Sequence, residues 1–176
     1  MKLQRKTSET TVTVEIGDDG NASSNTGVPF LDHMMSTLAK YSGVGFVIDT
    51  TGDLKHHLVE DVAITVGAIV REITPAKCAR FAESTVAMDD ALVHVVIDAG
   101  GRFYYEGALP GGLYDHWMRS FAENARITLH IRVLRGRDRH HIVECAFKAL
   151  GFALRSALVE GDTVFSTKGA VQVERQ

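Results

Sequence analysis

The feature that most constrains the fold of this chain is a motif that occurs twice: two adjacent histidines followed, three residues later, by a glutamate. It reads HHLVE from residue 56 and HHIVE from residue 140. An Asp-His pair precedes each copy, with His33 lying 23 residues before the first motif and His116 lying 24 residues before the second. Matched motifs whose separations differ by one residue indicate an internal duplication. We therefore expect two halves with similar folds.

Apolar periodicity predicts similar elements in the two halves. Alternating apolar residues favour strands at residues 12–16 and 127–133. Asp32 and Asp115 stand where helix N-caps are expected, and Gly43 is a suitable stop for the first helix. A helix is predicted after each HHxxE motif because apolar residues recur there at helical spacing. These stripes are Val59, Val62, Val66 and Ile69 in one half and Val143, Phe147, Leu150, Leu154 and Leu158 in the other.

The two halves are expected to share one core. The predicted joint, REITPAKCARFAESTVAMDD at residues 71–90, is not the glycine- and serine-rich sequence of a flexible linker. The 176 residues are long enough to bury a sizeable core. We therefore predict a single catalytic domain over residues 1–176, made of two pseudo-repeats at about 1–84 and 85–176.

Composition limits the class of protein and its partners. With 45% hydrophobic residues, 23% charged residues and a net charge of -3, the chain is typical of a soluble globular domain. Its basic residues are dispersed, and its apolar stretches are too short to span a bilayer. The first residues, MKLQRKTSET, lack the apolar segment of a signal peptide. We expect a cytoplasmic protein without nucleic-acid or membrane partners.

The HHxxE motif has the spacing of metal ligands if it begins a helix. His140 and Glu144 would then share one helical face, and His141 would lie about 100° away from His140. One histidine and the glutamate can therefore bind one metal while the adjacent histidine serves a second. Nitrogen and carboxylate ligands suit manganese, iron, zinc or nickel, and the two cysteines lack the spacing of a thiolate site. The candidate ligands are His33, His56, His57, Glu60, His116, His140, His141 and Glu144, with Asp32 and Asp115 as possible orienting carboxylates.

On these motifs the chain resembles the imidazoleglycerol-phosphate dehydratases of histidine biosynthesis. The likeness covers almost the whole chain, through FLDHM, HHLVEDV, YDHWMRSFA, ITLHIRVLRGRDRHHIVECAFKALGFALR and STKG. It implies an α+β fold of internally duplicated half-domains, each a roughly four-stranded sheet packed on two helices. It also implies that the eight candidate ligands bind two Mn²⁺ per active site at subunit interfaces, with other divalent metals possible, in a homo-oligomer of 24 subunits built from trimers.

The resemblance also implies residues for substrate binding and proton transfer. Residues that match the family's phosphate-binding groups are Arg80, Arg102, Ser166 and Lys168; a guanidinium fork suits phosphate oxygens. Glu9 matches the family's acid and base, and Glu60 and Glu144 are the other carboxylates expected at the catalytic centre. Asp61 is expected either to orient a ligand histidine or to act as a charge at a helix N-terminus.

The implied reaction is a dehydration of D-erythro-imidazoleglycerol phosphate to imidazole acetol phosphate by a hydro-lyase. No carbonyl acidifies the proton that leaves, so the imidazole ring must provide the activation. A metal-bound imidazolate would expel the neighbouring hydroxyl to give a diazafulvene-like intermediate. Loss of the side-chain proton and tautomerisation then give the ketone.

Two other classes of protein would also use these ligand types. A metallohydrolase would need an open metal position, but its HExxH and HxxEH spacings are absent from the sequence. A noncatalytic assembly protein that binds two metals would leave the phosphate-binding candidates without a role. Two departures from the family pattern are the short loop GDLKHHL before His56 and Thr37, where many relatives have glutamine.

Overall fold

The two halves of the chain contain the same elements in the same order. The computed structural model describes residues 1–18 and 20–162. The first half consists of β1 (Lys2–Lys6), β2 (Thr10–Gly17), β3 (Ala22–Asn25), α1 (Pro29–Ser42), β4 (Gly45–Gly52) and α2 (Lys55–Ile73). The second consists of β5 (Phe81–Met88), β6 (Ala91–Asp98), β7 (Tyr104–Glu106), α3 (Leu113–Ala125), β8 (Thr128–Arg135) and α4 (Arg139–Ala157). The expected α+β fold, with four strands and two helices in each half, is confirmed.

Each half forms its own four-stranded sheet. The strand orders are β1-β2-β4-β3 and β5-β6-β8-β7, so equivalent strands occupy equivalent places. β3 pairs with β4, and β7 with β8, in parallel, and the other pairs are antiparallel. Of the alternating apolar residues in the two predicted strands, Val12, Val14, Leu129 and Ile131 are buried. Val133 is exposed instead, next to the point where the β6–β8 register shifts.

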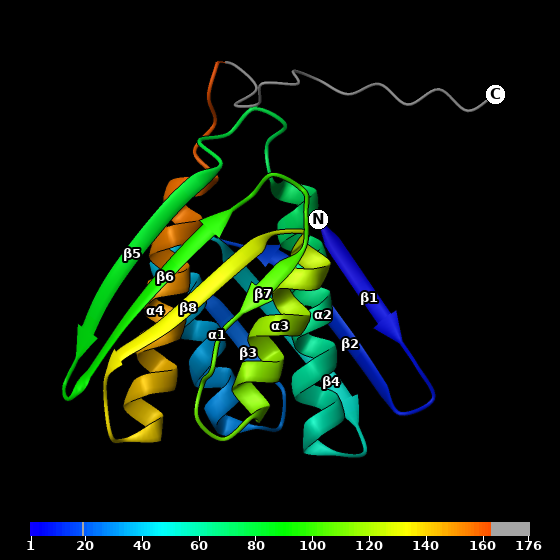
Figure 1. Ribbon diagram of the computed structural model, residues 1–176. Helices are drawn as coiled ribbons and strands as arrows, with labels where there is room; N and C mark the ends of the chain where they lie inside the picture. The colour runs from blue at the N-terminus through cyan, green and yellow to red at the C-terminus, as the bar shows by residue number, and fades with distance from the viewer. Residues whose placement is uncertain (19, 163–176) are drawn as a thin grey trace.

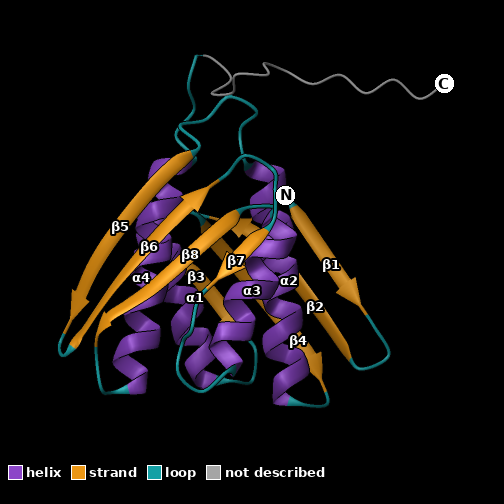
Figure 2. Ribbon diagram, in the orientation of Figure 1, coloured by secondary structure: helices purple, strands orange, loops and turns teal. Residues whose placement is uncertain are grey.

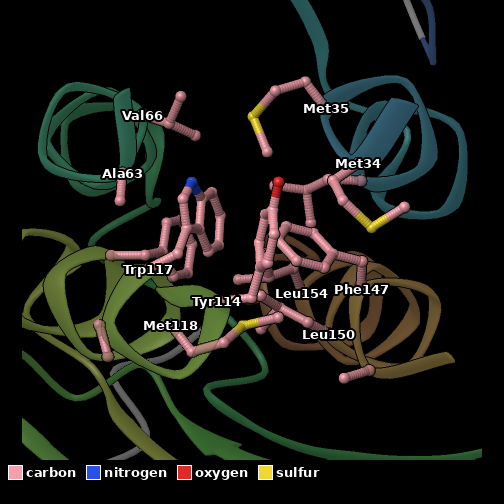
Figure 3. Close-up of a cluster of buried hydrophobic side chains, with 14 of the residues drawn as sticks. Met34, Met35, Ala63, Val66, Tyr114, Trp117, Met118, Phe147, Leu150 and Leu154 are labelled. Carbon is pink, nitrogen blue, oxygen red and sulfur yellow. The ribbon is translucent and has the colours of Figure 1, made fainter. Parts of the chain in front are cut away.

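The four helices of the described chain lie between the two sheets (Figures 1 and 2). α2 packs on the first sheet and α4 on the second, while the closest helix pairs, α2 with α3 and α1 with α4, join the two halves. Figure 3 shows side chains from all four helices meeting in one cluster. The ring centroids of Trp117 and Phe147 are 4.6 Å apart. The predicted apolar stripes of α2 and α4 are buried, apart from Leu158, which is partly buried. The halves therefore share one core.

Two equivalent glycines allow the helices of opposite halves to approach closely. Gly67 on α2 and Gly151 on α4 each lie eleven residues after the first histidine of their motif. A methyl group at Gly67 would lie 2.5 Å from the carbonyl oxygen of Phe121 on α3, and one at Gly151 would lie 2.7 Å from Cβ of Tyr41 on α1. Both contacts are too short for a side chain, so the backbones meet at these positions.

The structure changes two predictions about helix boundaries and the joint. Asp32 and Asp115 are not N-caps, because α1 begins at Pro29 and α3 at Leu113, so both aspartates lie in the first helical turn. Proline at the first helical position begins α1 without a side-chain cap. β5 begins at Phe81, within the predicted joint, and extends across the approximate boundary at 84/85. The connection between the halves is therefore residues 74–80. Gly43 does end α1, with a left-handed φ of 77°.

Within the described residues, none of the helices combines the length and apolar character that a bilayer-spanning helix needs.

Candidate metal centres

Six of the eight proposed ligands form two clusters whose ligand atoms lie within 4.8 Å of one another. The first cluster consists of His56, Glu60 and His116, and the second consists of His33, His140 and Glu144. In the first cluster, the Nε2 atoms of the two histidines lie 3.9 and 3.2 Å from different oxygens of Glu60. In the second cluster, both Nε2 atoms face the same oxygen of Glu144, at 3.0 and 3.1 Å.

Each cluster takes residues from both halves of the chain. Helix α2 provides a histidine and the glutamate of the first cluster, and α3 provides His116. Helix α4 provides the same pair for the second cluster, and α1 provides His33. Each Asp-His histidine therefore completes the cluster of the opposite half. The crossing follows from the close pairing of α2 with α3 and of α1 with α4.

The other two proposed ligands, His57 and His141, lie outside these two clusters, as expected for adjacent residues on a helix. Asp53 Oδ1 lies 2.9 Å from His57 Nδ1, and Asp90 Oδ1 lies 2.7 Å from His141 Nδ1. These hydrogen bonds raise the pKa of both imidazoles. The hydrogen bond with His141 is also the main cause that lowers the pKa of Asp90 to about 2. A carboxylate that holds Nδ1 fixes the ring orientation and leaves Nε2 for a metal.

The carboxylates that hold these rings differ from those proposed from the sequence. Asp32 accepts hydrogen bonds from Ser24 and Thr26, and Asp115 accepts them from Tyr105 and from the backbone of Leu109. Both aspartates therefore tie the start of a helix to the segment before it. Asp53 lies four residues before His57 and just before the N-cap of α2, and the short loop GDLKHHL brings it to that ring. Asp90, in the β5–β6 turn, gave no local signal.

Glu9 contacts His57, whereas Asp61 contacts Arg5 and Thr10. Glu9 is exposed in the β1–β2 turn, with Oε2 3.5 Å from His57 Nδ1. Glu9, Asp53 and His57 form a third group of residues that could hold a metal ion. Asp61 is buried and does not orient a histidine: it accepts a hydrogen bond from Arg5 Nε at 2.8 Å and another from the Thr10 hydroxyl. This carboxylate links α2 to its own sheet.

Arg80, one of the two arginines proposed for phosphate binding, lies far from the second cluster of the same chain. The Arg80 guanidinium donates to both oxygens of Asp98, at 2.6 and 3.0 Å, and this pairing lowers the pKa of the carboxyl. The Arg80 amide donates to the carbonyl of Ala157, the last residue of α4. Because His140 lies at the other end of that helix, the two sites are roughly 25 Å apart. Arg102 is exposed on the loop before β7. Ser166 and Lys168 lie outside the described residues.

The donor sets fit divalent transition metals. Each cluster has two imidazole nitrogens and one carboxylate, with no thiolate. His116 Nε2 is buried and has no hydrogen-bond partner among the described residues, although Glu60 Oε1 is 3.2 Å away. Burial alone would raise the pKa of Glu144, yet hydrogen bonds from His33 and Lys148 lower it. A buried imidazole nitrogen without a hydrogen-bond partner in the first cluster, and a carboxylate whose pKa is lowered in the second, both suit a bound cation.

Comparison with known proteins places this geometry in a family. The family model for imidazoleglycerol-phosphate dehydratase matches residues 26–154. The dehydratase of Kineococcus radiotolerans is 44% identical over 97% of this chain and 98% of its own length, and that of Methanococcoides burtonii is 40% identical over the same shares.

Solved structures agree with the sequence comparison. A crystal structure of IGPD from Pyrococcus furiosus, in complex with (S)-C348, superposes with a TM-score of 0.86 at 40% identity, covering 96% of this chain and all of that one. The dehydratase from Staphylococcus aureus superposes with a TM-score of 0.77 at 31% identity, over 92% of this chain and all of the other. The chain therefore belongs to the imidazoleglycerol-phosphate dehydratase family, whose members are hydro-lyases of histidine biosynthesis.

Proposed function

We propose that this chain dehydrates D-erythro-imidazoleglycerol phosphate to imidazole acetol phosphate with the help of two divalent cations, Mn²⁺ being the expected ion. The observation that carries the proposal is the pair of matched clusters, each with two imidazoles and one carboxylate. Their glutamates lie near the N-terminal ends of α2 and α4, at the same end of the helical layer (Figure 1). Family membership supplies the reaction.

The protein groups have separable tasks in this reaction. Two bound divalent cations would supply electrostatic stabilisation of a deprotonated imidazole ring. The two clusters would hold the cations, and Asp53 and Asp90 would keep His57 and His141 in one orientation. The substrate ring could then drive loss of its side-chain hydroxyl through the diazafulvene-like intermediate that the family resemblance implies.

Glu9 is the proposed group that moves the side-chain proton. Its carboxylate is exposed and lies 3.5 Å from Nδ1 of His57, which is adjacent in sequence to a first-cluster histidine. An exposed carboxylate beside a proposed ligand can approach a substrate that docks against the same surface. Glu60 and Glu144 would act at the catalytic centre by holding the cations rather than by carrying this proton.

The positions of the proposed groups favour an active site shared between subunits. A phosphate bound by Arg80 would lie roughly 25 Å from the second cluster of the same chain, farther than a substrate of this size extends. His57 and His141 lie outside the two clusters, and Nδ1 of each ring is hydrogen-bonded to an aspartate. We therefore propose that neighbouring copies supply these histidines and the phosphate-binding Arg80 and Arg102, in a homo-oligomer of 24 subunits built from trimers. Ser166 and Lys168 are assigned to the same phosphate by resemblance.

Product formation tests the proposed reaction directly. The Mn²⁺-loaded protein is incubated with imidazoleglycerol phosphate and the ketone product is followed, beside a chelated sample and a His140→Ala, His141→Ala double variant. His94→Ala is the matched control, because this histidine lies on β6 outside both clusters and contacts Thr85. We expect product from the loaded protein and the control variant only. No product from a protein with confirmed metal would instead support the noncatalytic metal-binding assembly.

Subunit complementation tests the shared site. An Arg80→Ala variant and a His140→Ala variant, each inactive alone, are mixed without metal and then reloaded. If one active site uses Arg80 and His140 from different chains, the mixture regains part of the activity. A mixture that forms mixed oligomers, shown by two different affinity tags, yet stays inactive would contradict the shared site.

A further inference from the structure

The two proposed metal-binding glutamates differ in their cationic neighbours. Lys148 Nζ lies 3.0 Å from Glu144 Oε1, one helical turn farther along α4. The lysine side chain is only 18% exposed, and it also contacts Met88 Sδ at 3.2 Å and lies over the Tyr41 ring. These contacts hold the ammonium group in place beside the second cluster.

The equivalent position in the first half carries no charge. Ile64 lies four residues after Glu60, as Lys148 lies four residues after Glu144. Within the described part of the chain, Glu60 forms ion pairs with His56 and His116 and none with a lysine or arginine. Both of its oxygens therefore face imidazoles, whereas one oxygen of Glu144 is occupied by Lys148. The second cluster offers a single oxygen to a cation.

Charges before the two motifs add to this difference. The eight residues before His140 include four arginines and one aspartate, whereas the eight before His56 include two aspartates and one lysine. A cation at the second cluster would thus lie beside a fixed ammonium group and follow a segment of net positive charge. A cation at the first cluster would follow a segment of net negative charge and lie beside a carboxylate without a lysine or arginine partner among the described residues. Direct repulsion between like charges weakens binding at the second cluster.

We propose that the two metal sites are unequal in affinity, because Lys148 makes the second cluster the weaker site and leaves the first cluster to fill first. This inference rests on the proposed function, which requires both clusters to hold divalent cations. It assigns to Lys148 a positioning role: the residue fixes one oxygen of Glu144 and sets the affinity of the site without binding the metal itself.

Titration of the metal-free full chain with Mn²⁺ tests the inference, with free Mn²⁺ measured by electron paramagnetic resonance. We expect two classes of site, each holding one ion per chain, with dissociation constants that differ at least tenfold. His33→Ala should remove the weaker class and His116→Ala the tighter one. Lys148→Met should tighten the weaker class on the order of tenfold, whereas Lys148→Arg, which retains the charge, should leave it weak.

Ile64→Met is the matched control, because it changes side-chain shape at the equivalent position without changing charge. Both classes should keep their affinities in this variant. Two classes that stay unchanged in Lys148→Met, or a tighter class that disappears in His33→Ala, would overturn the inference and leave the proposed reaction intact. A protein that binds no Mn²⁺ would instead overturn the proposed function. Circular dichroism and thermal melting confirm that each variant is folded.

Discussion

The two halves of the chain present the same ligand types at the same helical positions in different surroundings. Glu60 in the first half has a side chain that is 35% exposed, with only histidines as ion-pair partners among the described residues. Glu144 in the second half is 9% exposed and pairs with Lys148 as well as two histidines. The residue after each glutamate also differs, with a buried aspartate in one half and a buried cysteine in the other.

This difference separates what the duplicated fold requires from what each site can vary. Both halves have a glycine at the helix crossing, a histidine on the opposite helix and a glutamate that faces it. Charged residues one or four positions after the glutamate are free to differ, because they contact their own sheet or their own cluster. Each proposed metal site can therefore be tuned separately while the helix packing stays the same.

The largest effect on activity is expected when either cluster loses the negative charge of its glutamate. Glu60→Gln and Glu144→Gln keep the size of the side chain and remove the only anionic ligand of a cluster. Since a metal ion contributes several kcal/mol to stabilisation of charge, each change should lower kcat/KM on the order of a thousandfold. Activity and bound metal are measured at saturating Mn²⁺. If one variant lost its metal yet stayed active, the halves would be unequal in catalysis as well as in surroundings.

The next effect concerns the helix crossings that the halves share. Gly67→Ala and Gly151→Ala would each force a methyl group to within 3 Å of a neighbouring helix. Overpacking of this kind should lower the free energy of unfolding of the metal-free protein by about 2 kcal/mol in each variant. Urea denaturation followed by circular dichroism measures it. Gly161→Ala is the control, because a methyl group there meets nothing within 4 Å and should change stability by less than about 0.5 kcal/mol.

Much of this arrangement follows from local patterns in the sequence. The duplicated motifs give the proposed ligands, and helical spacing separates each pair of adjacent histidines. The crossing of ligands between halves could not be predicted in that way, because which helices pack together is not a local property. The matched glycines Gly67 and Gly151 were the available signal, since small residues at equivalent positions indicate close backbone contact. Asp90 reaches His141 across 51 residues, and no spacing rule connects them.

A smaller effect is expected from the ion pair that links α2 to its sheet in the first half, where the equivalent residue of the second half, Cys145, donates its thiol to the Val86 carbonyl. Arg5→Met removes the 2.8 Å hydrogen bond to Asp61 and leaves that buried carboxylate with the Thr10 hydroxyl as its hydrogen-bond partner. Because Arg5 is 41% exposed, we expect a loss of about 1 to 2 kcal/mol in unfolding free energy rather than the full cost of a buried unpaired charge. Lys2→Met, which breaks the exposed pair with Glu15, should cost less than about 0.5 kcal/mol. Equal effects would show that Asp61 does not tie α2 to its sheet.

The smallest expected effect is a difference in stability between variants of the two aspartates that hydrogen-bond to His57 and His141. Asp90 accepts hydrogen bonds from the backbone amides of Arg137 and Asp138 and pairs with His141, whereas Asp53 accepts one from the amide of Leu54 and pairs with His57. Its extra partner indicates that Asp90→Asn should destabilise the metal-free protein more than Asp53→Asn. Thermal melting of the two variants beside the unmodified protein measures this order at pH 6.

The pH dependence of the Asp90 effect has a definite sign. Because its hydrogen bonds lower the pKa of Asp90 from 3.8 to about 2, the folded protein binds the proton less tightly than the unfolded chain does. The stability that Asp90 contributes is therefore fully present above about pH 4 and is lost as the pH falls toward 2. The difference in melting temperature between the unmodified protein and Asp90→Asn should be constant from pH 6 to 5 and narrow below pH 4. A difference that widens in acid would mean that His141 and the turn before α4 do not hold the Asp90 carboxylate in its charged form. The hydrogen bonds of Asp90 would then not distinguish the surroundings of His141 from those of His57.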